Sequence, residues 1–213
     1  MKKALVLLSV LFLLTAASVA SADTIGNAII PRGFLDSATY IAFIDPTLVF
    51  PTAGTLDSWS LYYLADLGDT FAPQVYRPTA TPNTWELVYS EKWTAVAGFN
   101  NPVTLPVTPP FNVQAGDVVG WWFGAGGGTI PFDYTGSDEV VWTNYLVSQI
   151  TNPVVGTSYT FDTSYWQDQG IKLREYSIAA NYTPAPVPEP ATMLLLASGL
   201  VGLAGMRRKF RKN

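Results

Sequence analysis

The sequence predicts an all-β body, folded as a two-sheet antiparallel sandwich of jelly-roll-like type, between two terminal segments of different character. Short runs rich in Val, Tyr, Trp and Thr recur along residues 23–186. Fourteen Gly and fourteen Pro interrupt these runs, so no long window has the apolar spacing of an amphipathic helix. Within the runs, apolar and polar residues alternate as a half-buried strand requires.

Residues 1–22 are typical of a secretory signal peptide. Lys2 and Lys3 form a basic start, an apolar run follows, and the small residues Ala20-Ser21-Ala22 precede Asp23. The apolar run is shorter than the ~20 residues of a spanning helix, which favours cleavage after Ala22 over an uncut anchor.

The body is expected to span residues 23–183, which is long enough for one domain with a substantial core. Strands are expected at residues 39–44, 55–64, 74–77, 84–90, 103–107, 118–123, 140–147, 158–161 and 171–180. Many short strands at this spacing favour a sandwich. Period-two alternation places two sets of residues on shared faces: Trp59, Leu61 and Tyr63 in one strand, and Trp85, Leu87 and Tyr89 in another.

The strand at residues 118–123 contains two adjacent tryptophans that point to opposite faces. Trp121 is expected to face the core. Trp122, with glycines on its own face, is then a candidate platform for stacking a sugar ring. The alternative is that Trp122 covers a glycine gap or packs under a loop. Trp166, in a polar segment, is the second stacking candidate.

Three carboxylates gather in one Gly-bearing segment, namely Asp133, Asp138 and Glu139. Carboxylates on loops suit Ca²⁺, so these residues form a weak candidate calcium site, the only cofactor considered. No EF-hand spacing is present. Two alternatives are open: solvated loop acids, or the paired acids of a glycoside hydrolase.

The composition excludes several functions. The chain has no Cys and no His, so it has no disulfide, zinc finger, Cys nucleophile or Ser-His-Asp triad. Only 13% of its residues are charged, about half the usual share. Residues 23–186 hold five basic and fifteen acidic residues, a net charge of −10. Such a body disfavours nucleic acid and anionic lipid as partners, and leaves divalent cations and neutral glycans open.

The C-terminus has three consecutive parts. Residues 184–190 form a Pro-rich linker that contains Val187, Pro188, Glu189 and Pro190. Residues 191–206 are uncharged and apolar, which predicts a transmembrane helix. Residues 207–213 are predicted to stay cytoplasmic, as a positive stop formed by five basic residues: Arg207, Arg208, Lys209, Arg211 and Lys212.

This tail resembles the PEP-CTERM sorting signal of Gram-negative bacteria, with its V-P-E-P motif, apolar helix and Arg-rich end. The resemblance implies an exosortase-type membrane protease-transpeptidase as partner. It also implies export through the inner membrane, transient anchoring there, and a final place at the cell surface or in the extracellular biofilm matrix, among polysaccharide. The alternative is an ordinary single-span tail anchor.

Two function classes follow from these observations. The first is a non-catalytic exported cell-surface or matrix protein that binds glycan through exposed aromatic residues. The second is an exported carbohydrate-active enzyme, a glycoside hydrolase or lyase, with the same tail. We predict the first, and assign no catalytic residue, because no convincing catalytic constellation is present.

Overall fold

The computed structural model describes residues 21–37, 39–64, 68–96, 101–134, 142–143, 149–161 and 174–186. Every element among them is a β-strand, so the all-β prediction is confirmed. Within these ranges no helix has the length and apolar character needed to cross a membrane. The predicted signal peptide and the predicted helix at 191–206 lie outside the described residues. Val19–Ala185 form one compact unit.

Thirteen strands are described. In chain order they are β1 (Asp23–Gly26), β2 (Ile41–Val49), β3 (Gly54–Tyr63), β4 (Thr70–Pro78), β5 (Thr84–Ser90), β6 (Trp93–Thr94), β7 (Asn101–Val113), β8 (Val118–Phe123), β9 (Phe132–Tyr134), β10 (Trp142–Thr143), β11 (Ser158–Thr160), β12 (Arg174–Tyr176) and β13 (Ile178–Pro184). The last strand ends at Pro184, so the body extends one residue into the range that the sequence assigned to the linker.

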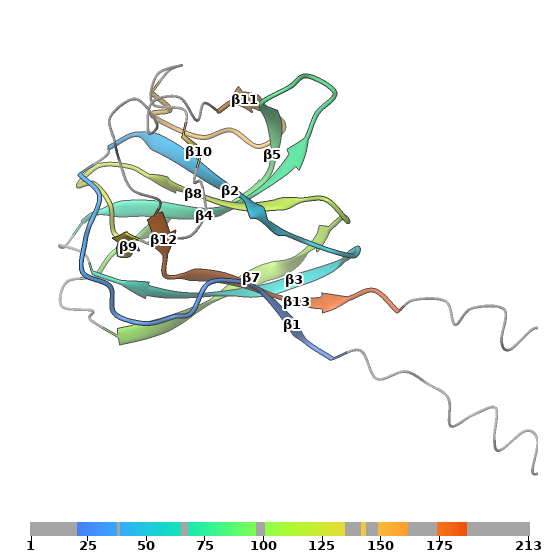
Figure 1. The fold of residues 1–213 in the computed structure, drawn as a ribbon, viewed down its shortest axis with the longest axis horizontal. Helices are drawn as coiled ribbons and strands as arrows, with labels where there is room; N and C mark the ends of the chain where they lie inside the picture. Colours follow the sequence, from blue (N-terminus) through green and yellow to red (C-terminus); the bar gives the residue numbers. More distant parts are fainter. Residues whose placement is uncertain are drawn as a thin grey trace, which may run out of the picture. The chain divides into compact units, whose positions relative to one another are not determined.

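The described strands form three antiparallel sheets. A four-stranded sheet has the order β1-β13-β3-β7, and a larger sheet has the order β10-β2-β8-β4-β5-β11, with β6 also paired to β4. Strands β12 and β9 pair as a small third sheet. Figure 1 shows the four-stranded sheet along the lower side of the body and the strands β2, β8 and β4 of the larger sheet above it. The two main sheets make the predicted sandwich.

The main core lies between these two sheets. Trp59, Leu61 and Tyr63 of β3 are buried there, as their shared face predicted, and they meet Phe43 and Trp121 from the larger sheet. Phe43 and Trp121 stack with their ring centroids 5.8 Å apart. The opposite face of β3 is polar. There the Asn181 side chain donates hydrogen bonds to Ser58 and Ser60.

A second core covers the outer face of the larger sheet. It contains side chains from the outer faces of four strands, β2, β4, β5 and β8, and two residues that cover them: Ala42, Ile44, Ala72, Tyr76, Trp85, Leu87, Val118 and Trp122, with Ile150 and Phe161 as the cover. All six residues of β8 are therefore buried. Burial on both faces explains why the sequence of β8 is apolar throughout rather than alternating.

One predicted face is wrong because of a β-bulge. Tyr89 does not share a face with Trp85 and Leu87. Tyr76 pairs with Leu87 and Val75 pairs with Tyr89, so one extra residue of β5 sits between the two pairs. Tyr89 consequently turns to the main core, where it stacks on Trp59 with ring centroids 6.4 Å apart.

The other strand predictions differ from the structure in length, in continuity or in number. β7 is longer than the predicted 103–107 although it contains Pro102, Pro106, Pro109 and Pro110. It lies at an edge of its sheet, where a residue without an N–H is tolerated. The predicted strand 171–180 is divided at Ser177 between β12 and β13. β1, β6 and β9 were not predicted.

Candidate functional site

The end of the body fixes where the predicted sorting tail begins. β13 pairs with β3 as far as Pro184, and the Ala185 N–H then donates to the Ala53 carbonyl at 2.8 Å. On its other side β13 pairs with β1, with Asp23 opposite Tyr182. Because these strands are antiparallel, the start of β1 and the end of β13 lie at the same end of the four-stranded sheet. Both predicted terminal segments therefore attach at that end.

Trp122 is not exposed, which corrects the prediction of a sugar-stacking indole at this position. Its side chain is fully buried in the second core, and its Nε1–H donates to the Ile150 carbonyl at 2.6 Å. A Cβ on Gly124 would lie 2.5 Å from the indole, so the ring fills the space above this glycine. The alternative interpretation, a tryptophan that covers a glycine gap beneath a loop, describes the site.

Several predicted site residues lie outside the described residues. They are the stacking candidate Trp166, the carboxylates Asp138 and Glu139, the motif residues Val187, Pro188, Glu189 and Pro190, and the basic residues Arg207, Arg208, Lys209, Arg211 and Lys212. Within the described part of the chain, no group of three or more acidic residues could hold a metal ion.

Asp133, the described member of the candidate calcium site, is engaged with the N-terminal segment. Its Oδ1 accepts the Gly33 N–H at 2.7 Å, and its Oδ2 lies 3.8 Å from the Arg32 guanidinium. Arg32 is buried and also pairs with Glu175 at 2.6 Å and donates to the Ser177 hydroxyl at 2.8 Å. Asp133 of β9 and Glu175 of β12 thus hold the segment that precedes β2 against the small sheet.

A second ion pair holds the same segment from the other face of the small sheet. The Arg174 guanidinium pairs with the Asp36 carboxylate, which also accepts the Tyr176 hydroxyl at 2.8 Å. Burial raises the pKa of Tyr176 well above its usual value, and the neighbouring Asp36 carboxylate raises it further. Tyr176 therefore remains a neutral hydrogen-bond donor at physiological pH.

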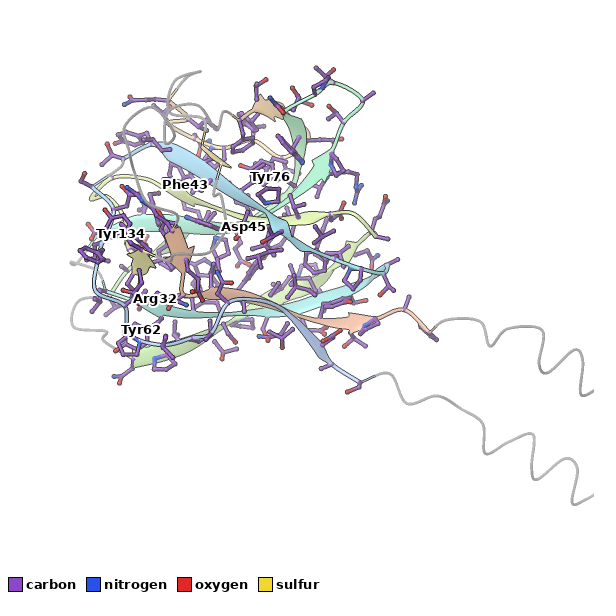
Figure 2. The ribbon with its side chains drawn as sticks, in the orientation of Figure 1. Arg32, Phe43, Asp45, Tyr62, Tyr76 and Tyr134 are labelled. Atoms are coloured by element: carbon purple, nitrogen blue, oxygen red, sulfur yellow. The ribbon has the colours of Figure 1, made fainter. Side chains whose placement is uncertain are left out.

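Two exposed aromatic rings lie beside this ion pair, and we call Phe34 and Tyr134 the aromatic face. Phe34 forms an isolated β-bridge with Phe132, which places its ring 4.8 Å from that of Tyr134. The two side chains are 48% and 38% exposed. Tyr134 is the last residue of β9, and Figure 2 shows it at the outer margin of the body. Sequence reasoning missed this pair because Phe34 belongs to a segment without strand alternation, and only the fold brings it to Tyr134.

Asp45 is a further buried acid, on β2 rather than in the small sheet or the segment that precedes β2. It lies on β2 at the point where the register with β8 shifts (Figure 2). Its Oδ1 accepts both the N–H and the hydroxyl of Thr47, at 2.9 and 2.6 Å. Among the described residues its Oδ2 has no hydrogen-bond partner. Burial raises the pKa of Asp45 above its usual value, although the bonds from Thr47 oppose this.

The chain thus consists of a β-sandwich body followed directly by a C-terminal segment whose composition is Pro-rich, then apolar, then basic. Residues 186–209 match the PEP-CTERM protein-sorting motif, which begins two residues after the last strand ends. The motif implies that the protein is exported, transiently anchored in the membrane, processed by an exosortase and delivered to the surface. The body matches no family model, and no curated protein matches the chain.

Proposed function

We propose that this chain is a non-catalytic cell-surface or extracellular-matrix protein whose β-sandwich body binds extracellular polysaccharide. The observation that carries the proposal is the sorting motif at residues 186–209, attached directly to a compact body. In this proposal the signal peptide is removed after Ala22, residues 191–206 hold the precursor in the inner membrane, and the basic end stays in the cytoplasm until the tail is cut.

The roles of the acidic side chains support a non-catalytic body. Asp36 and Glu175 are paired with Arg174 and Arg32, in contacts that hold the N-terminal segment in place. Asp117 forms a two-bonded pair with Arg77, with N–O distances of 2.8 and 2.9 Å, and also accepts the Gln114 N–H. Each of these carboxylates forms an ion pair that stabilises the fold.

The test of delivery uses the full chain in a bacterium that contains an exosortase-type enzyme and in a matched strain that lacks it. In the first strain we expect a shortened product at the surface. A Pro188→Ala/Glu189→Ala double variant should accumulate uncut in the inner membrane, because the motif no longer marks the cleavage region. Pro184→Ala is the matched control, since it removes a proline just before the motif match. Identical processing of all three chains in both strains would overturn the proposal.

The second candidate function is an exported carbohydrate-active enzyme, a glycoside hydrolase or lyase. It rests on the acidic segment that contains Asp133, Asp138 and Glu139. Release of new reducing ends from a polysaccharide by the purified body, lost in Asp138→Asn or Glu139→Gln, would favour this function. We expect no such release.

A further inference from the structure

The two rings of the aromatic face pack on the buried ring of Phe132, which restricts their movement. The ring of Phe132 lies 5.8 Å from Phe34 and 5.3 Å from Tyr134, and is itself buried against Tyr176. The guanidinium of Arg174 covers the Phe132 ring at 4.4 Å. The backbones of Phe34 and Phe132 exchange two hydrogen bonds, of 3.1 and 2.9 Å. Two exposed rings fixed in this way lose little conformational entropy when a ligand binds.

The charges near the aromatic face compensate one another. Arg174 and Asp36 are paired, and their side chains are only 12% and 8% exposed. The positive charge beside the rings is therefore neutralised internally. The body as a whole carries a net charge of −10, which repels polyanions. These charges favour an uncharged ligand.

The size of the aromatic face argues against a second copy of the chain as its occupant. A Phe or Tyr side chain buries roughly 150–250 Å² when it is covered completely, so two half-exposed rings offer roughly 200 Å². A stable protein–protein interface needs about 800 Å² from each partner. A small ligand, or a chain that contacts the protein one unit at a time, fits this area.

We infer that the aromatic face, Phe34 and Tyr134, binds a neutral polysaccharide by stacking sugar rings on its aromatic rings. The C–H bonds of a pyranose carry partial positive charge, and they match the negative face of an aromatic ring. The two rings are inclined at 55°, so they offer surfaces of different orientation to a non-planar sugar. This inference rests on the proposed function and assigns its binding site.

The test uses the purified body, residues 23–186, which contains all the described strands and both cores. Electrophoretic mobility is measured in native gels that contain dextran, galactomannan, xyloglucan or, as an anionic comparison, alginate. Phe34→Leu keeps an apolar side chain but removes the ring. Tyr134→Ala removes the second ring, and Leu35→Ala is the matched control, because Leu35 is equally exposed but aliphatic. Thermal unfolding of each variant verifies that it is folded.

We expect at least one neutral polysaccharide to retard the body and alginate not to. Phe34→Leu and Tyr134→Ala should each weaken this binding about five- to tenfold, the effect of one aromatic contact, and Leu35→Ala should not. The inference is overturned if no neutral polysaccharide binds, if folded Phe34→Leu and Tyr134→Ala bind as the wild type does, or if Phe34→Leu instead abolishes a concentration-dependent self-association. Binding that persists in folded Phe34→Leu and Tyr134→Ala would contradict this site alone, whereas the absence of any polysaccharide binding would also contradict the binding part of the proposed function. The delivery experiment tests the sorting part independently of both results.

Discussion

At the scale of the residue, the buried Asp45 contributes to the pH dependence of stability. Burial raises the pKa of Asp45 above its usual value because the charged form loses its hydration. When the pKa of a carboxyl group is higher in the folded than in the unfolded state, the group stabilises the fold fully at any pH below its unfolded-state pKa. That stabilisation is lost as the pH rises through the folded pKa. At neutral pH the ionised side chain therefore opposes folding.

Asp45→Asn should accordingly increase the free energy of unfolding at pH 7. The amide oxygen can still accept both bonds from Thr47, and no charge is buried. The gain should exceed the ~0.5 kcal/mol typical of neutral surface substitutions and should shrink as the pH is lowered towards 4. Urea unfolding followed by tryptophan fluorescence between pH 4 and 8 measures this, with Asp23→Asn on the exposed β1 as control. A variant that is less stable than the wild type at pH 7 would contradict the explanation.

At the scale of elements, β8 is the strand on which both cores depend. Trp121 points into the main core and Trp122 into the second, from adjacent positions. Gly120 lies between Tyr76 and the Phe43 carbonyl, and an added Cβ would approach these groups to 2.8 and 2.6 Å. Gly120 thus makes room for the Tyr76 ring on the side of the second core.

Trp122→Ala should lower the free energy of unfolding by about 3–5 kcal/mol, because it leaves a large cavity in the second core. Trp122→Phe should cost less, since it keeps a ring and loses the hydrogen bond to the Ile150 carbonyl. Leu35→Ala, at an exposed position, serves as the comparison. Denaturant unfolding of the purified body measures all three. Wild-type stability in Trp122→Ala would mean that the second core contributes little.

The strands that the sequence predicted best are those that directly follow turn-forming residues. Residues 84–90 and 118–123 match β5 and β8, since Pro82-Asn83 and Gly116-Asp117 mark their starts. What could not be predicted depends on contacts distant in the chain. The second core is covered by Ile150 and Phe161, and period-two alternation does not show which distant residues cover a sheet.

The candidate sites also divide into those that local sequence predicts and those that depend on contacts distant in the chain. The sorting motif is contiguous in sequence, so its residue types and their order were enough to predict it. The aromatic face unites Phe34 with Tyr134 through a bridge between segments about a hundred residues apart. Sequence alone offered only the alternation of Phe132 and Tyr134 as a signal. Surface sites built by the fold therefore needed the structure.

At the scale of the whole molecule, the most consequential feature is that the two ends of the body are neighbours in one sheet. β1 pairs with β13 over four residues, and β13 continues to the last residues before the sorting motif. If the signal peptide is cut after Ala22, the first strand of the mature chain then pairs with the strand that leads into the tail. The new N-terminal strand is then hydrogen-bonded to the strand that precedes the sorting motif.

A disulfide tests this arrangement in a chain that has no cysteine of its own. Thr24 and Asn181 are register partners, and their side-chain oxygens are 3.1 Å apart. Thr24→Cys/Asn181→Cys should therefore form a bond on oxidation, detected as a mobility shift on non-reducing gels. The bond closes a loop between positions 157 residues apart, so it should stabilise the oxidised form over the reduced form by about 2–4 kcal/mol. Thr24→Cys/Thr55→Cys is the control, because β13 separates those strands and the cysteines are too far apart to bond. If the control pair forms the bond and the Thr24/Asn181 pair does not, β1 does not occupy this edge of the sheet, and the two ends of the body are not neighbours.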